Sequence, residues 1–145
     1  MIVVDTNVIA YLLITGERTP EARATLLKDP EWVAPLLWRS EFRNVLALYM
    51  RQKRLTLTDA LTLAEQAEDL FDGREYLVES LEVLSLCSTS GCSGYDCEFA
   101  ALARRLGVPL VTADTELLRS FPSAVSVEAF AQLQGGVEET RPPDS

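Results

Sequence analysis

The sequence predicts an α/β fold, a three-layer α/β/α sandwich with a central parallel sheet. Short apolar segments rich in β-branched residues alternate along the chain with longer segments of helical periodicity. The short segments are apolar throughout, as in strands that helices cover on both faces. The chain has 145 residues, enough for one domain with a substantial core. We therefore expect a single domain over residues 1–133 and a disordered tail over residues 134–145.

The predicted elements follow in order from local composition. Strands that are short and apolar are expected at residues 1–4, 31–35, 76–78, 109–114 and 125–127. Helices are expected where an apolar face recurs, at residues 8–13, 20–28, 36–54, 59–71, 80–86, 95–106, 115–119 and 128–133. Thr58 is the expected cap of helix 59–71, Gly107 ends helix 95–106, and residues 88–94 read as a loop.

Composition narrows the possible functions. The longest apolar run, residues 8–14, is too short to span a membrane, and no basic segment precedes it as in a signal peptide. We therefore expect a cytoplasmic protein with no membrane partner. The chain has no histidine and only three cysteines, which excludes a tetrahedral zinc set and histidine-dependent hydrolases and nucleases. Any catalysis would need carboxylates, metal ions or both.

Four acidic residues stand in positions that helix and strand propensities explain poorly. Asp5 and Asp114 each end an apolar strand, Glu41 interrupts the apolar face of a long helix, and Asp96 begins a helix with an apolar face. Burying one unpaired carboxylate is costly, and several close together repel one another. Mg²⁺ or Mn²⁺ held by oxygen ligands would resolve the conflict.

Each acidic residue also has a structural interpretation. Asp5 and Asp114 are possible N-caps of the helices that follow them. Asp96 is a first-turn acid that the helix dipole favours, and Glu41 is a possible partner of an arginine on a neighbouring element. Spacing along the chain does not show whether the four side chains converge.

Four segments, in order, resemble the motifs of PIN domains. Asp5-Thr6-Asn7 after a Val-rich strand resembles their opening motif, and residues 38–46 resemble their Ser-Glu-x-x-Asn-Val-Leu helix. Residues 93–98 are similar to their Ser-x-Tyr-Asp-Ala segment, with Cys97 in place of alanine, and residues 106–114 match their Leu-Gly-x-Pro-Leu-x-Thr-x-Asp strand. Size and motif style look most like the VapC-type toxins of bacterial toxin–antitoxin pairs.

The resemblance implies a site and an activity. Asp5, Glu41, Asp96 and Asp114 would form an acidic pocket for Mg²⁺ or Mn²⁺. Thr6 and Thr112 would supply hydroxyl groups beside this pocket, and Asn7 would hold the first loop. The family's members are metal-dependent endoribonucleases, often homodimeric, and its toxins are held inactive by a small antitoxin.

The net charge of −9 stands against strong general binding to nucleic acid, although divalent cations would neutralise an acidic pocket. Arg39 and Arg43 lie one turn apart on the helix face away from Glu41. They are candidate contacts to RNA phosphates, and a solvated helix face is the alternative.

Two other interpretations remain open. One is a PIN-like domain that no longer cleaves and serves as a binding or regulatory module. The intact acidic quartet argues against it, because a retired pocket is free to lose costly carboxylates. The other is a phosphotransfer enzyme with Asp5 as nucleophile. A haloacid-dehalogenase-type phosphatase would need aspartate at Asn7, and a receiver domain would need lysine near Ala113-Asp114.

Overall fold

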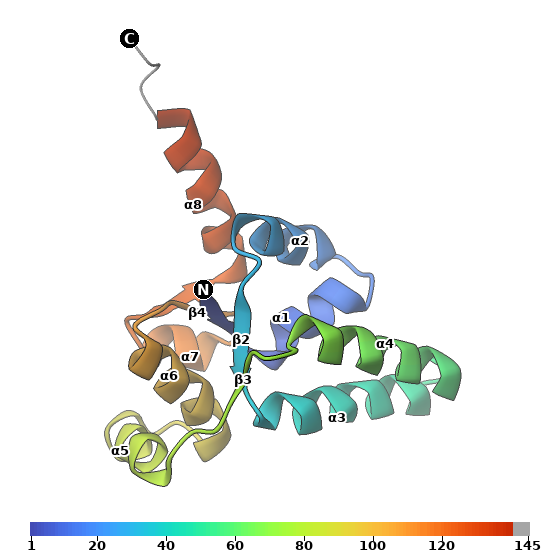
Figure 1. The fold of residues 1–145 in the computed structure, drawn as a ribbon, viewed down its shortest axis with the longest axis horizontal. Coiled ribbons are helices and arrows are strands. Elements are labelled where there is room, and N and C mark those ends of the chain that lie inside the picture. The colour runs from blue at the N-terminus through green and yellow to red at the C-terminus, as the bar shows by residue number, and fades with distance from the viewer. Residues whose placement is uncertain (141–145) are drawn as a thin grey trace.

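A computed structural model describes residues 1–140 of the chain, with side chains described through residue 133 (Figure 1). The strands in this range are β1 (Ile2–Val4), β2 (Trp32–Pro35), β3 (Glu75–Tyr76), β4 (Leu110–Thr112) and β5 (Ala124–Ser126). The helices are α1 (Thr6–Leu13), α2 (Thr19–Lys28), α3 (Leu37–Arg51), α4 (Leu57–Leu70), α5 (Ser80–Ser90), α6 (Gly94–Leu106), α7 (Thr115–Ser120) and α8 (Val127–Thr140).

The strands form one parallel sheet in the order β3-β2-β1-β4-β5. β1 lies in the centre, where Val3 pairs with Val33 of β2 on one side and with Leu110 of β4 on the other. The chain runs outward from β1 through β2 to β3 and then returns to the other side of β1. This order confirms the predicted parallel sheet and creates a topological switch point between β1 and β4.

Helices cover both faces of the sheet. Figure 1 shows α1, α2, α3 and α4 on one side of the strands and α5, α6 and α7 on the other. This division follows from the preference for right-handed crossovers. The connections β1–β2 and β2–β3 run in one direction along the sheet and β3–β4 and β4–β5 in the other, so the two pairs pass over opposite faces. The predicted three-layer α/β/α sandwich is therefore confirmed.

The core includes the central strand β1 and the inner face of α3. All three residues of β1 are buried, which explains its unbroken apolar sequence. On α3, Trp38 and Phe42 are buried, and the Trp38 ring lies 4.8 Å from the ring centroid of Phe71, the residue that follows α4. Apolar packing thus fixes α3, the helix that also carries Glu41, against the sheet.

The N-terminus of α4 differs from the prediction. The cap is Thr56, not Thr58: its hydroxyl accepts a hydrogen bond from Asp59 N at 3.1 Å, and its own N–H donates to Asp59 Oδ2 at 3.0 Å. This reciprocal pair is a capping box, in which an acid three residues after the cap returns a hydrogen bond. Thr58 lies inside the first turn, where its side chain has no such role.

Helix α5 extends into the segment predicted as a loop. The small polar residues at its end are helical, and Ser88 and Ser90 donate their hydroxyl protons to the carbonyls of Ser85 and Leu86, at 2.8 and 2.7 Å, so these hydroxyls are satisfied within the helix. Gly91 then ends the helix with a φ of 74°, a left-handed conformation that favours glycine. Only residues 91–93 separate α5 from α6.

Helix α8 is longer than predicted. The sequence predicts a helix at residues 128–133 and a disordered tail at 134–145, whereas α8 spans Val127–Thr140. Lys28 of α2 contacts this helix: its Nζ donates to the carbonyl of Phe130 at 2.9 Å and lies 4.1 Å from the centre of the Phe130 ring. Residues 141–145 of the predicted tail lie outside the described part of the chain, where disorder stays a prediction.

The described residues also answer two questions of composition, the possible membrane span and the state of the cysteines. No helix in residues 1–140 combines the length and hydropathy needed to cross a bilayer. The three cysteines are free thiols: Cys92 and Cys97 are buried, and Cys87 is half-buried.

The capping box leads to a stability prediction. Thr56→Ala should lower the free energy of unfolding by about 1 kcal/mol, because it removes the acceptor of the Asp59 N–H. Urea denaturation followed by circular dichroism measures this change. Thr58→Ala is the matched control and should leave stability the same or slightly higher, since alanine is the better helix former. Equal losses in both variants would contradict the assignment of the cap.

Candidate active site

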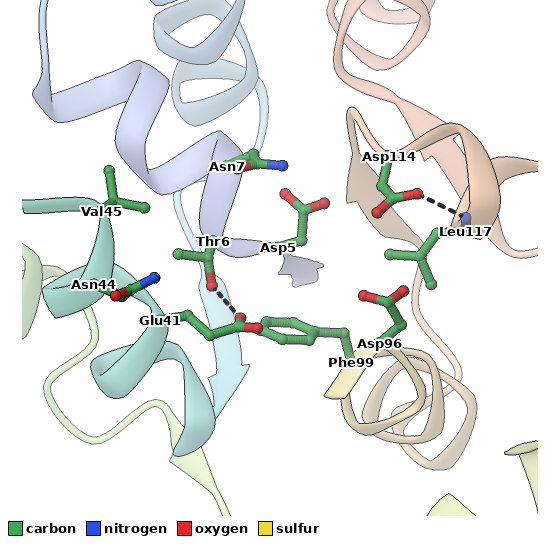
Figure 2. Close-up of a pocket in the computed structure, with 10 residues that line it drawn as sticks. All are labelled: Asp5, Thr6, Asn7, Glu41, Asn44, Val45, Asp96, Phe99, Asp114 and Leu117. Carbon is green, nitrogen blue, oxygen red and sulfur yellow. Dashed lines mark hydrogen bonds between the residues drawn. The ribbon is translucent and has the colours of Figure 1, made fainter. Parts of the chain in front are cut away.

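A cavity of about 290 Å³ opens at the carboxyl ends of the central strands (Figure 2). It lies at the switch point between β1 and β4, where ligands bind in open α/β sheets. The residues that line it come from α1, α3, α6 and α7 and the strand ends: Asp5, Thr6, Asn7, Glu41, Asn44, Val45, Asp96, Phe99, Asp114 and Leu117. The structure thus brings all four sequence-predicted carboxylates to one cavity.

Asp5 joins the end of β1 to the start of α1. Its Oδ1 accepts a hydrogen bond from Val8 N at 3.2 Å, so the predicted capping role is present. Its Oδ2 accepts a hydrogen bond from the Thr112 hydroxyl. The side chain is only 6% exposed. Burial is the main cause that raises the pKa of Asp5 from 3.8 to about 6, and the two hydrogen bonds oppose this rise.

Thr112 connects Asp5 to Asp114. While its hydroxyl proton goes to Asp5, its Oγ1 accepts the Asp114 N–H at 2.9 Å. Asp114 in turn caps α7, with Oδ1 accepting from Glu116 N at 2.7 Å and from Leu117 N at 3.3 Å. The capping alternative is therefore correct for Asp114 as well as Asp5, and both side chains still face the cavity.

Glu41 reaches the cavity from α3. Its Oε1 accepts a hydrogen bond from the Thr6 hydroxyl at 2.7 Å, as Figure 2 shows. Burial is the largest cause that raises the pKa of Glu41, and the charges of Asp96 and Glu98 add to it. The described residues provide no arginine partner for Glu41, which leaves the structural alternative for this residue without support.

Asp96 belongs to the first turn of α6. Ser93 caps this helix by accepting the Asp96 N–H at 3.1 Å, which sets the carboxylate at the edge of the cavity. Burial raises the pKa of Asp96, and the charge of Asp114 raises it further. The charges of Asp114 and Glu41 likewise raise the pKa of Asp5, and these effects reflect proximity, because like charges disfavour one another's ionisation.

The donor set fits a hard divalent cation in its chemistry. Four carboxylates and the hydroxyl of Thr6 line the cavity, and no lysine or arginine is among the lining residues. As the described side chains stand, no three acidic groups converge on a single coordination position. A cation with a partial water shell, as Mg²⁺ usually keeps, is therefore the form that this set of ligands suits.

The remaining sequence-predicted residues are arranged differently. Asn7 lies in the first turn of α1, and its exposed side chain lines the cavity; that it holds the first loop stays a prediction. Arg39 is bound within the protein: its Nη2 donates to Glu75 Oε1 at 2.9 Å, and its Nε pairs with Glu75 Oε2. Arg43 is exposed. Contact of either arginine with RNA stays a prediction, and Arg39 would have to leave Glu75 to make it.

One lining residue was missed by sequence reasoning as a functional candidate. Asn44 follows Glu41 by three residues on α3, a spacing that places two side chains on the same helix face. Glu41 and Asn44 both line the cavity. Asn44 is also the asparagine of the Ser-Glu-x-x-Asn-Val-Leu motif, so both the helical spacing and the motif could have identified it.

Known proteins resemble this chain over most of its length. A family model described as PIN domain matches residues 2–121. "Ribonuclease VapC3" of Pyrobaculum aerophilum is 27% identical over 128 residues, which cover 86% of this chain and 98% of that protein.

Solved structures share the fold. PAE2754 of Pyrobaculum aerophilum aligns with a TM-score of 0.75 at 22% identity, covering 93% of this chain and 89% of that one. A toxin–antitoxin complex from Klebsiella pneumoniae aligns with a TM-score of 0.59 at 19% identity, covering 88% of this chain and 98% of that one.

The raised pKa of Asp5 predicts a pH-dependent stability. The folded state binds the Asp5 proton more tightly than the unfolded state, so stability is greatest with Asp5 protonated and falls as pH rises from 3.8 to about 6. The cost of ionising Asp5 is about 3 kcal/mol. In metal-free buffer, the free energy of unfolding of wild type relative to Asp5→Asn should fall by about this amount between pH 3.8 and pH 7.

Chemical denaturation at several pH values, with EDTA present, measures this difference. Asp69→Asn on α4 is the matched control, because it removes an exposed carboxylate far from the cavity. A difference between wild type and Asp5→Asn that does not change with pH would contradict the raised pKa.

Proposed function

Because the chain belongs to the PIN domain family, we propose that it is a divalent-metal-dependent endoribonuclease that hydrolyses RNA phosphodiester bonds. The observation that carries the proposal is the gathering of Asp5, Glu41, Asp96 and Asp114 around one cavity with no lining cation. Three of these carboxylates have raised pKa values, which is typical of groups arranged for chemistry. The relative that is named a ribonuclease supports RNA as the substrate.

In this proposal the four carboxylates hold Mg²⁺ or Mn²⁺. Asp114 keeps its Oδ2 without a hydrogen bond among the described residues, so this oxygen is available as a ligand. Asp5 is held by Thr112 and Glu41 by Thr6, which limits the movement of both carboxylates. When bound, a divalent cation makes water a stronger nucleophile near neutral pH and offsets the charge of the phosphate.

The protein's own groups would position the reactants. Asp96 or Asp114 orients the attacking water, and the raised pKa of Asp96 suits it to accept a proton from that water. Attack in line with the leaving oxygen needs no covalent intermediate on the protein. It leaves a 5′-phosphate on one product and a 3′-hydroxyl on the other.

We further propose that the protein is the toxin of a toxin–antitoxin pair. The toxin–antitoxin complex from Klebsiella pneumoniae supports this role through its shared fold. The chain would then act on RNA in the cytoplasm, form a homodimer, and be inhibited by a small antitoxin.

Loss of the carboxylate of Asp96 or of Asp114 should nearly abolish cleavage. Asp96→Asn and Asp114→Asn should each lower kcat/KM for a single-stranded RNA by about 100-fold or more. Asparagine remains a good N-cap, so the fold of the Asp114→Asn variant should survive. Gel assays with Mn²⁺, and with EDTA in parallel, measure the effect.

Glu116→Gln is the control for that assay, because Glu116 lies beside Asp114 on α7 but is exposed and pairs with Arg119. It should cleave like wild type. Wild-type protein that stays inactive on many RNAs with Mn²⁺ would overturn the ribonuclease and favour a PIN-like binding or regulatory module.

Expression in bacterial cells tests the toxin role. Induction of the wild-type protein should slow growth, because unchecked RNA cleavage depletes the cell of intact transcripts. Asp96→Asn, produced at the same level, should leave the growth rate unchanged. Normal growth with active wild-type enzyme present at that level would refute the toxin role while leaving the nuclease intact.

A further inference from the structure

The cavity lacks the cations that usually bind phosphate. A phosphodiester is negatively charged, and proteins commonly hold it with arginine, lysine or backbone N–H groups. None of the ten lining residues is arginine or lysine. Either type would form ion pairs with Asp5, Asp96 or Asp114 and compete with a divalent cation for them. Neutral donors avoid this competition.

Only two lining side chains have protons to donate to a substrate. The carboxylates of the four acids accept, and Val45, Phe99 and Leu117 are apolar. The hydroxyl proton of Thr6 is already donated to Glu41. The amides of Asn7 and Asn44 therefore remain as the side-chain donors of the lining set. They are also the only two asparagines in the chain of 145 residues.

Both amides line the cavity and have no hydrogen-bond partner among the residues whose side chains are described. Figure 2 shows Asn7 and Asn44 on the α1 and α3 side of the cavity, with Asp96 and Asp114 across from them. Both side chains are exposed. Neither amide makes a hydrogen bond to another described side chain or backbone group. A phosphate between the two sides would meet the amides on one flank and the acids on the other.

Helix stability does not explain Asn44. The residue stands in the middle of α3, where asparagine is less favourable than alanine. Asn44 is exposed, and its amide has no hydrogen-bond partner among the described residues, so its role is to be sought outside the stability of the fold.

We propose that Asn7 and Asn44 donate hydrogen bonds from Nδ2 to the non-bridging oxygens of the RNA phosphate that is cleaved. This inference rests on the proposed ribonuclease function. Asn44 and Glu41 come from the same face of α3, so one helix presents a donor for the substrate beside a carboxylate for the cation. The two amides fix the phosphate against the acids without adding a charge.

Substitution of each asparagine tests the proposal. Asn44→Ala and Asn7→Ala should each lower kcat/KM for a single-stranded RNA by about 10- to 100-fold, the loss expected for a hydrogen bond to a charged group. The melting temperature without metal should be unchanged or higher for Asn44→Ala. The rise in melting temperature that Mn²⁺ causes should match wild type in both variants, since the carboxylates are intact.

Gln66→Ala on α4 is the matched control, because it removes an exposed amide away from the cavity. It should cleave like wild type. A lower melting temperature, or a lost response to Mn²⁺, in the asparagine variants would assign the residues to the fold or to the metal and overturn the proposal.

Phosphorothioate substrates identify the atom that is contacted. Replacing one non-bridging oxygen at the cleaved position with sulfur weakens its hydrogen bonds, because sulfur is a poor acceptor. For the diastereomer whose sulfur faces Asn44, wild type and Asn44→Ala should cleave within about threefold of each other. If Asn44→Ala lowers kcat/KM by the same factor on the oxygen substrate and on both phosphorothioate diastereomers, the phosphate contact is overturned.

These experiments distinguish failure of the phosphate contact from failure of the ribonuclease function. If wild type cleaves RNA and both asparagine variants cleave it as fast as wild type does, the phosphate contact is refuted and the ribonuclease function stands. If wild type cleaves no RNA, the proposed function fails and the phosphate contact fails with it.

Discussion

The hydroxyl of Thr112 is the interaction on which the geometry of the cavity depends. It is fully buried, it donates its proton to Asp5, and it accepts the N–H of Asp114. One side chain therefore joins the carboxyl ends of the two central strands and holds both acids at the same opening. A valine would have nearly the same shape, yet it would leave a buried carboxylate without its donor and a backbone N–H without its acceptor.

The buried carboxylates that line the cavity lower the stability of the folded protein. Burial, more than repulsion between neighbours, is what raises the pKa values of Asp5, Glu41 and Asp96. The fold offsets this cost elsewhere, through the buried central strand and the aromatic contacts of Trp38 with Phe42 and Phe71. Such local conflict within an otherwise consistent sequence is expected at functional sites.

Sequence predicted the sheet because its strands are apolar throughout. The resemblance to PIN domains predicted the shared acidic pocket, which spacing along the chain did not show. Partners distant in sequence could not be predicted. Thr112 lies 107 residues from Asp5, and Glu75, 36 residues from Arg39, binds an arginine that seemed free for RNA. The cap of α4 was also predicted wrongly as Thr58, because the reciprocal hydrogen bonds between Thr56 and Asp59, three residues apart, were not considered.

If a cation binds in the cavity as proposed, the buried Asp5 carboxyl would exchange its proton for that cation. With its pKa raised to about 6, a substantial fraction of molecules carry a proton there in mildly acidic solution. A cation that takes its place must expel that proton, so occupancy would release acid into the medium and weaken as the medium acidifies. Through Asp5, which is held by Thr112 and by the N-terminus of α1, cation binding would then depend on the acidity of the surroundings.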